Sequence, residues 1–183
     1  STYNFEKGVY DKRVYQGFGK PDSDAELRFG PNITDWPEMY ELSENLLVKL
    51  ACVLHDDVTT TDELIPSGET SSYRSNPLRL SEFALSRREP QYVPRAKAVA
   101  AEEAKRRADN SSSEVIEALS KVVENAEETA KHTQFGSCVF ACRPGDGSAR
   151  EQAASCQKVL GGFANICYEF ATKRYRSNCI NWG

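Results

Sequence analysis

A glycine-rich segment in the last quarter of the chain carries residue types suited to binding an anion. Residues 145–150 read Gly-Asp-Gly-Ser-Ala-Arg and separate a short apolar run, 137–141, from a helix-favouring run, 153–160. Glycines let successive backbone N–H groups converge, and the start of a helix adds unpaired donors and a positive dipole. Arg150 would add a bidentate fork for a carboxylate. By itself the pattern is equally typical of a tight turn, because the Lys-Ser/Thr ending of a nucleotide-binding loop is absent.

Two upstream segments carry further polar residues that could serve such a site. Residues 60–64 read Thr-Thr-Asp-Glu-Leu and contain Asp62, and residues 73–77 read Tyr-Arg-Ser-Asn-Pro and contain Arg74. Alone, Asp62 is more typical of a turn cap and Arg74 of a surface arginine. A role in chemistry therefore depends on whether the fold brings these segments to the glycine-rich loop.

Composition excludes several other classes of function. The 183 residues suffice for one folded domain, and the net charge of -4 disfavours a nucleic-acid partner. The longest apolar run, 46–54, is too short to cross a bilayer, and the first residues do not form a secretory signal, so we expect a cytoplasmic protein without a membrane partner. The six cysteines lack paired CxxC spacing and the only histidines are His55 and His132. We therefore expect reduced, mostly buried thiols and no metal ligated by this chain.

The pattern of residues predicts which elements position the loop. Residues 1–45 mix aromatics with turn formers and predict an extended linker arm from preceding domains, with a folded domain at 46–183. We expect a buried strand at 46–54, a short helix at 78–86 with Pro77 in its first position, and a strand at 137–141. Residues 94–131 predict a helical insertion: a largely exposed helix over 94–108, then a second helix with Ser111 and Glu114 at capping-box spacing and an apolar stripe of Val115, Leu119 and Val122.

Together these segments resemble the C-terminal domain of the aconitase superfamily. Residues 145–152 are similar to that family's Gly-Glu-Gly-Ser-Ser-Arg-Glu-His, and the likeness continues through 153–154, 160–162, 170–171 and Asn178. Residues 60–64 resemble its Thr-Thr-Asp-His-Ile stretch, and 73–77 its Arg-Gly-Asn segment. More narrowly, the chain is similar to the end of the YbhJ-like bacterial hydratases of this superfamily.

The resemblance implies an α/β fold of the three-layer β/β/α swivelling type, found in aconitase C-terminal domains and isopropylmalate dehydratase small subunits, here with a helical insertion. Such a domain closes over the N-terminal cluster-binding domains of the same polypeptide, which hold a [4Fe-4S] cluster that this chain does not ligate. It implies Ser148 as the base that removes a proton from a hydroxy di- or tricarboxylic acid, and Arg74 and Arg150 as the groups that hold the carboxylates. Asp62 would be a proton-handling partner in the wall, and Gly147 and Ala149 would belong to the substrate-binding loop.

Departures from the family pattern bear on the substrate. Ala149 stands where a second serine is usual, Glu63 replaces a histidine, and Gln152 replaces another. Two alternatives stay open: a separately encoded small subunit of an isopropylmalate-dehydratase-type enzyme, and a non-catalytic carboxylate-binding module. The aromatic arm at 1–45 favours one long polypeptide over the small subunit, and we expect the isolated chain to be inactive.

Overall fold

The computed structural model describes residue 4 and residues 6–13, 17–109 and 112–183. The chain divides into two compact units, residues 1–30 and residues 31–183. In the first unit the described helix is α1 (Lys7–Asp11), a five-residue helix without a buried side chain. The functional segments all lie in the second unit, which is described by itself below.

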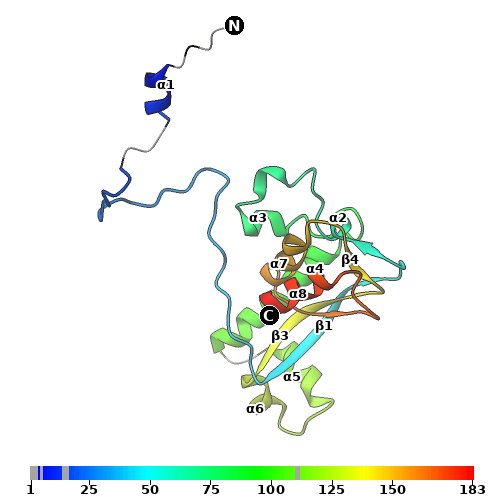
Figure 1. Ribbon diagram of the computed structural model, residues 1–183. Coiled ribbons are helices and arrows are strands. Elements are labelled where there is room, and N and C mark those ends of the chain that lie inside the picture. Colours follow the sequence, from blue (N-terminus) through cyan, green and yellow to red (C-terminus); the bar gives the residue numbers. More distant parts are fainter. Residues whose placement is uncertain (1–3, 5, 14–16, 110–111) are drawn as a thin grey trace. The chain divides into compact units, whose positions relative to one another are not determined.

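Parallel strands and helices make up the second unit (Figure 1), which confirms the mixed α/β class. The described strands form one sheet in the order β1-β3-β5 and a second, two-stranded sheet β2-β4, and every strand pair is parallel. The strands are β1 (Asn45–Leu54), β2 (Thr59–Thr60), β3 (Thr133–Ala141), β4 (Pro144–Asp146) and β5 (Gly162–Ile166). The helices are α2 (Thr61–Leu64), the 3-10 turn η1 (Ser71–Tyr73), α3 (Pro77–Ser81), α4 (Tyr92–Asp109), α5 (Ser113–Ser120), α6 (Ala126–Lys131), α7 (Arg150–Val159) and α8 (Lys173–Trp182).

Strand β3 is the centre of the larger sheet, and all its residues except Phe140 are buried. The strand expected at 46–54 forms as β1, but it is an edge strand rather than a buried one. Leu46, Val48 and Leu50 are exposed on the face that they share. Sequence alone could not separate the two cases, because an apolar run of this length occurs in both central and edge strands.

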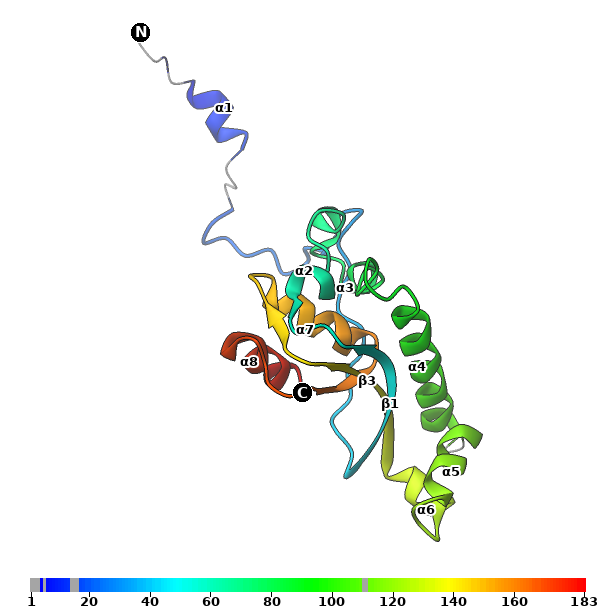
Figure 2. The same ribbon diagram turned by 90° about the vertical axis from the view of Figure 1, so that its right-hand side faces the viewer.

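Helix α4 runs alongside β1 and β3, and α5 and α6 lie at the end of these strands that is remote from β4 (Figure 2). The helix expected over 94–108 forms as part of α4, and its outer positions are exposed as expected, but it also buries one face that includes Ala96, Val99 and Glu103. The insertion holds three helices where two were expected. Val122 is not part of the apolar stripe, because it follows the end of α5 and is 75% exposed.

The ends of α5 and α3 are set by capping residues and by proline. Ser112 is the N-cap of α5 and accepts a hydrogen bond from the Val115 N–H, whereas the expected cap Ser111 lies outside the described residues. Pro77 begins α3 as expected, with Asn76 as its cap. The helix ends at Ser81 rather than continuing to residue 86, and a series of turns follows in which Leu85 has a φ of 54°.

Residues 31–44 belong to the second unit, which begins upstream of the boundary expected at residue 46. Gln134, a buried residue of β3, donates to the Glu41 carbonyl and accepts from the Ser43 N–H, both at 2.8 Å. The Trp36 and Trp182 rings lie 4.8 Å apart between centroids. Residues 31–44 therefore satisfy both hydrogen-bonding groups of a buried amide in the central strand, and they are part of the packed structure of the second unit.

The described cysteines are all free thiols, and Cys52, Cys138 and Cys156 are buried. His55 and His132 are exposed. None of the helices in the described residues has the length and apolar character needed to span a membrane.

Candidate anion-binding site

The glycine-rich loop lies between two helices and approaches both too closely for any side chain. Gly145 has a φ of 99°, and a Cβ there would lie 2.2 Å from the Tyr175 ring of α8. Gly147 has a φ of 124°, and a Cβ there would lie 2.3 Å from the Thr61 Oγ1 of α2. Both positions therefore require glycine on two grounds, the left-handed backbone and the lack of space.

Parallel pairing of β2 with β4 brings the segment after Thr60 beside this loop. The register joins Thr59 to Pro144 and Thr60 to Asp146, so both strands end at the same edge of the small sheet. Each strand leads into a helix, α2 from the first and α7 from the second. This edge is where ligands of open parallel sheets bind, because helix starts converge there.

Helix α8 is tied to the loop at its first turn. The Thr172 hydroxyl donates to the Gly145 carbonyl at 3.0 Å and accepts from the Tyr175 N–H at 3.2 Å. Tyr175 is fully buried, and its hydroxyl accepts from the Gln157 side chain of α7 at 3.1 Å. Burial raises the pKa of Tyr175 well above its ordinary value, so it stays a neutral packing residue. These contacts fix the side chains at the start of α8 next to those at the start of α7.

The start of α7 offers free donors. Its N-cap is Ala149, which provides no side-chain cap to the first-turn amides. The helix is held in place from its other side, since Ala153, Ala154 and Cys156 are buried in the main core. Arg150, the first residue of the helix, is half-buried, and its Nε has no hydrogen-bond partner in the described chain although that atom is buried. An uncapped helix start with an unpaired guanidinium nitrogen suits an anion.

A pocket of about 360 Å³ opens where these two helices begin. Ser148 and Arg150 line it from the loop and α7, opposite Lys173 and Arg174 from α8; the other lining residues are Glu151, Ser177 and Asn178.

A smaller pocket of about 140 Å³ adjoins it and is lined by Arg74 and Gln152, with Glu151 shared between the two. The fold thus places Arg74, which is far from Arg150 in sequence, beside the first turn of α7.

Unpaired cations concentrate around this helix start. In residues 31–143 every Lys and Arg side chain except Arg74 lies within ion-pair distance of a carboxylate. In residues 144–183 no Lys or Arg has such a partner. Four cations of the described second unit that lack a carboxylate partner line the two pockets, namely Arg74, Arg150, Lys173 and Arg174. The other two lie elsewhere: Lys158 is near the C-terminal end of α7 and donates to the Gly183 carbonyl at 3.0 Å, and Arg176 lines other pockets. Four cations beside the single carboxylate of Glu151 make the site electropositive, which suits an anion.

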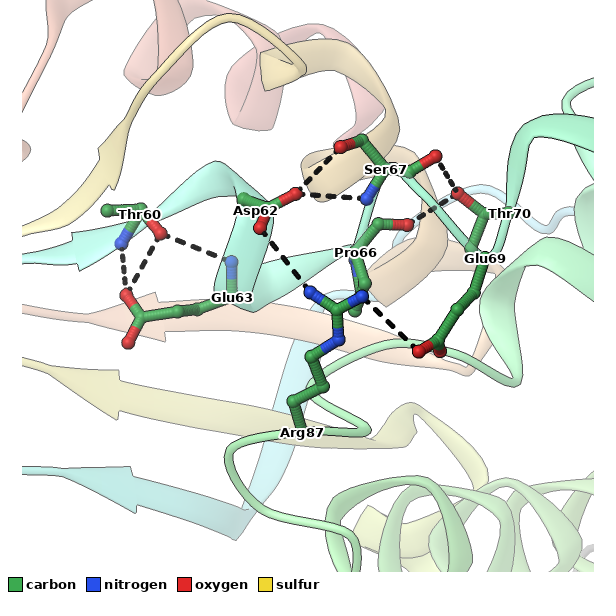
Figure 3. Close-up of polar contacts among 8 residues, drawn as sticks. All are labelled: Thr60, Asp62, Glu63, Pro66, Ser67, Glu69, Thr70 and Arg87. Atoms are coloured by element: carbon green, nitrogen blue, oxygen red, sulfur yellow. Dashed lines mark hydrogen bonds and ion pairs between the residues drawn. The ribbon is translucent and has the colours of Figure 1, made fainter.

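Asp62 takes part in a separate polar network at α2 (Figure 3). One carboxylate oxygen accepts from the Ser67 N–H at 3.0 Å and from the Ser67 hydroxyl at 2.8 Å. The other lies 3.7 Å from a guanidinium nitrogen of Arg87, which also contacts the Glu69 carboxylate at 3.2 Å. The hydrogen bonds from Ser67, aided by Arg87, lower the pKa of Asp62, so the carboxylate is ionised and can accept but not donate a proton.

Glu63 completes a capping box with Thr60, which fixes where α2 begins (Figure 3). The Thr60 hydroxyl accepts from the Glu63 N–H at 3.2 Å, and the Glu63 carboxylate accepts from the Thr60 N–H at 2.7 Å. Glu63 therefore has a structural role in this chain, as the residue that caps the start of α2.

The site residues inferred from the sequence lie in two neighbouring groups. Ser148 and Arg150 line the larger pocket, Arg74 lines the adjoining one, and Gly147 and Ala149 form the turn that leads into α7. Asp62 follows Thr61, against which Gly147 lies, but its carboxylate is engaged with Ser67 and Arg87. Sequence reasoning missed Lys173 and Arg174; their adjacency directly after the cap Thr172 was the available signal.

Comparison of the chain with models of protein families, with curated proteins and with solved structures gave no match. Within the described residues no group of three or more His, Cys, Asp or Glu side chains could hold a metal ion. Burial raises the pKa of Cys52 to about 11 and of Cys156 to about 12, so both thiols are protonated at neutral pH.

Proposed function

We propose that this chain is the substrate-binding swivel domain of a cytoplasmic, aconitase-like hydro-lyase that reversibly dehydrates or hydrates a small hydroxy di- or tricarboxylic acid. The observation that carries the proposal is the gathering of unpaired cations, Arg74 and Arg150 among them, around the uncapped start of α7. The sequence resemblance supplies the reaction class, and the site supplies the anionic character of the substrate.

Carboxylate recognition is the first task of these residues. Arg150 lines the larger pocket and has a buried Nε without a hydrogen-bond partner, and the first-turn amides of α7 are free of side-chain acceptors. A carboxylate there would gain a charge-assisted hydrogen bond and the favourable end of the helix dipole. Arg74 lines the adjoining pocket, so a second carboxylate of the same small acid could be held across Glu151.

Proton removal is assigned to Ser148. It is exposed in this chain, and in water its hydroxyl is a poor base. Its position before an uncapped helix, with Arg150 in the same pocket, would stabilise the alkoxide once the site is closed and dry. Asp62 is ionised and already accepts two hydrogen bonds from Ser67, so its part would be to orient polar groups in the wall.

In the proposal, other domains of the polypeptide close the substrate site and hold the cofactor. The N-terminal domains of the same polypeptide would hold a [4Fe-4S] cluster, which supplies Lewis-acid chemistry at the substrate hydroxyl when bound. The residues of this chain bind the acid, orient it and accept the proton at Ser148 Oγ. The three-layer β/β/α swivelling fold is likewise part of the proposal.

The decisive experiment measures hydration of unsaturated di- and tricarboxylic acids by the chain joined to its cluster-binding domains. Ser148→Ala is expected to lower kcat by about 10³-fold, the scale of a lost general base, with the cluster spectrum unchanged. Ser120→Ala, an exposed serine on α5, is the matched control and keeps full activity. Arg150→Lys is expected to raise KM by about tenfold, because the lysine lacks the planar fork.

Two results would contradict the proposal. Full activity of Ser148→Ala would remove this serine as the base, and an unchanged KM in Arg150→Lys would remove the carboxylate contact. Tight binding of dicarboxylic acids by the isolated chain, without turnover in the joined protein, would instead favour a non-catalytic carboxylate-binding module.

A further inference from the structure

We infer that Lys173 and Arg174 of α8 form a second anion subsite facing Ser148 and Arg150, which makes the site selective for acids with a third anionic group. This inference rests on the proposed function, because it assumes that Arg74 and Arg150 hold two carboxylates of the same molecule. The inference gives α8 a role in substrate specificity. The sequence resemblance matched Asn178 of this helix but implied no site residue in it.

The subsite consists of one stretch of α8 that faces the pocket. Arg174, Ser177 and Asn178 are spaced i, i+3 and i+4, and Lys173 is four residues before Ser177, so these side chains project from one side of the helix. They provide a guanidinium, an ammonium and an amide that can donate hydrogen bonds to an oxyanion, whereas the Ser177 hydroxyl already donates to the Lys173 carbonyl at 3.0 Å. All four residues line the same pocket as Ser148 and Arg150.

The start of α8 is anchored so that these donors stay beside the loop. Tyr175, the residue after Arg174, is fully buried with its ring against Gly145, and Thr172 is bonded to the Gly145 carbonyl. Lys173 and Arg174 themselves are exposed and therefore free to reach a ligand. Because the backbone at the start of α8 is fixed, the charges of Lys173 and Arg174 stay within one side-chain length of the pocket. Such placement suits them to discriminate between ligands.

Charge balance makes a third anionic group favourable. The pocket contains three cations, Arg150, Lys173 and Arg174, and its single carboxylate belongs to Glu151. Neither Lys173 nor Arg174 has an ion-pair partner in the described chain, unlike the Lys and Arg residues of α4. An acid whose two carboxylates are held by Arg74 and Arg150 leaves Lys173 and Arg174 unneutralised when the site closes, which is costly in a low dielectric.

The shared chemistry of the expected ligand is an additional oxyanion, either a carboxylate or a phosphate. Ala149 supports this assignment, since it lacks the hydroxyl that the resemblance places beside Ser148 and therefore leaves carboxylate recognition to the cations. Neutral hydroxyl donors would tolerate acids of different charge, whereas two unpaired cations discriminate by charge.

The test is a titration of the ¹⁵N-labelled 183-residue chain at low ionic strength with tricarballylate, glutarate and inorganic phosphate, followed by amide chemical shifts. We expect millimolar binding of tricarballylate with shifts at both 147–152 and 172–178, and weaker binding of glutarate with shifts at 147–152. Arg174→Gln should weaken tricarballylate binding by about fivefold and glutarate binding by less than twofold. If Arg174→Gln abolishes the binding of inorganic phosphate, the additional anionic group is a phosphate. If Arg174→Gln leaves phosphate binding unchanged, the additional group is a carboxylate.

Arg176→Gln is the matched control, because it removes the same charge two residues further along α8 and Arg176 does not line this pocket. An equal effect of Arg176→Gln and Arg174→Gln would overturn the subsite, since the effect would then be long-range attraction. Equal affinities for the two acids, both weakened by Arg150→Gln, would overturn the subsite and leave the proposed function intact. If Arg150→Gln changes neither affinity, the carboxylate site of the proposed function falls as well.

Discussion

Gly147 shows at the scale of one residue how the loop depends on backbone freedom. Gly147→Ala should destabilise the chain by about 1–3 kcal/mol, because a Cβ would meet Thr61 Oγ1 in a backbone conformation that alanine rarely adopts. Chemical denaturation of both proteins measures the difference. Gly68→Ala is the control: its Cβ would meet no atom within 4 Å, so the two variants should differ in sign or by more than 1 kcal/mol. Equal effects would show that close packing at Gly147 is unimportant.

Asp62 is the residue whose titration reports on the α2 network. Its pKa is lowered in the folded chain, so its stabilising effect is present above the unfolded pKa of about 4 and is lost as the pH falls through the folded pKa. Ser67→Ala removes the hydroxyl donor and should move the pKa of Asp62 upward, as followed by carboxyl NMR shifts between about pH 2 and pH 6. Ser72→Ala, an exposed neighbour, should leave that titration unchanged. An unmoved pKa in Ser67→Ala would mean that the Ser67 N–H and Arg87 hold it low without help from the hydroxyl.

At the scale of an element, a buried carboxylate of α4 bonds to the central strand of the sheet, and Arg95 of the same helix donates to the Ala51 carbonyl of β1 at 3.3 Å. Glu103 accepts from the Arg106 guanidinium at 2.6 and 2.8 Å and from the Phe135 N–H of β3 at 2.8 Å. The helix is rich in Ala, Lys and Arg, so its composition favours helix formation without showing that it packs. The buried network decides how the helix is seated on β3.

Glu103→Gln should destabilise the chain by roughly 3–5 kcal/mol, because Arg106 would stay buried without its counter-charge. Urea denaturation of the variant beside Glu117→Gln provides the comparison. Glu117 is exposed on α5, and its substitution should change the free energy of unfolding by about 0.5 kcal/mol at most. A small effect at Glu103 would mean that the helix is held by its apolar face alone.

For the whole molecule, residues 31–44 decide where the folded unit begins. A chain that starts at residue 45 should melt about 5 °C below one that starts at residue 31, since Gln134 would lose both partners of its buried amide and Trp36 would be removed from Trp182. Calorimetry of the two chains makes the comparison. Equal melting temperatures would restore the boundary at residue 46 that the sequence suggested.

Local sequence determined those features that depend on neighbouring residues. The strand that includes residues 137–141 and the helix after the glycine-rich segment follow from β-prone residues and a run of helix formers, whereas residues 144–146 pair as β4 where the sequence suggested only a turn. Pro77 marked the start of α3 because its fixed φ suits the first helical position. Such signals act over a few residues and need no distant partner.

Tertiary structure alone decided which charges are free and which segments meet. Arg74 and Arg87 are both arginines in polar surroundings, but only the fold places Arg87 between Asp62 and Glu69 and leaves Arg74 unpaired beside α7. The exposure of β1 and the convergence of α8 on the loop likewise arise from strand order and parallel register. Ion pairing depends on distances between segments remote in sequence, and residue type and spacing do not contain those distances.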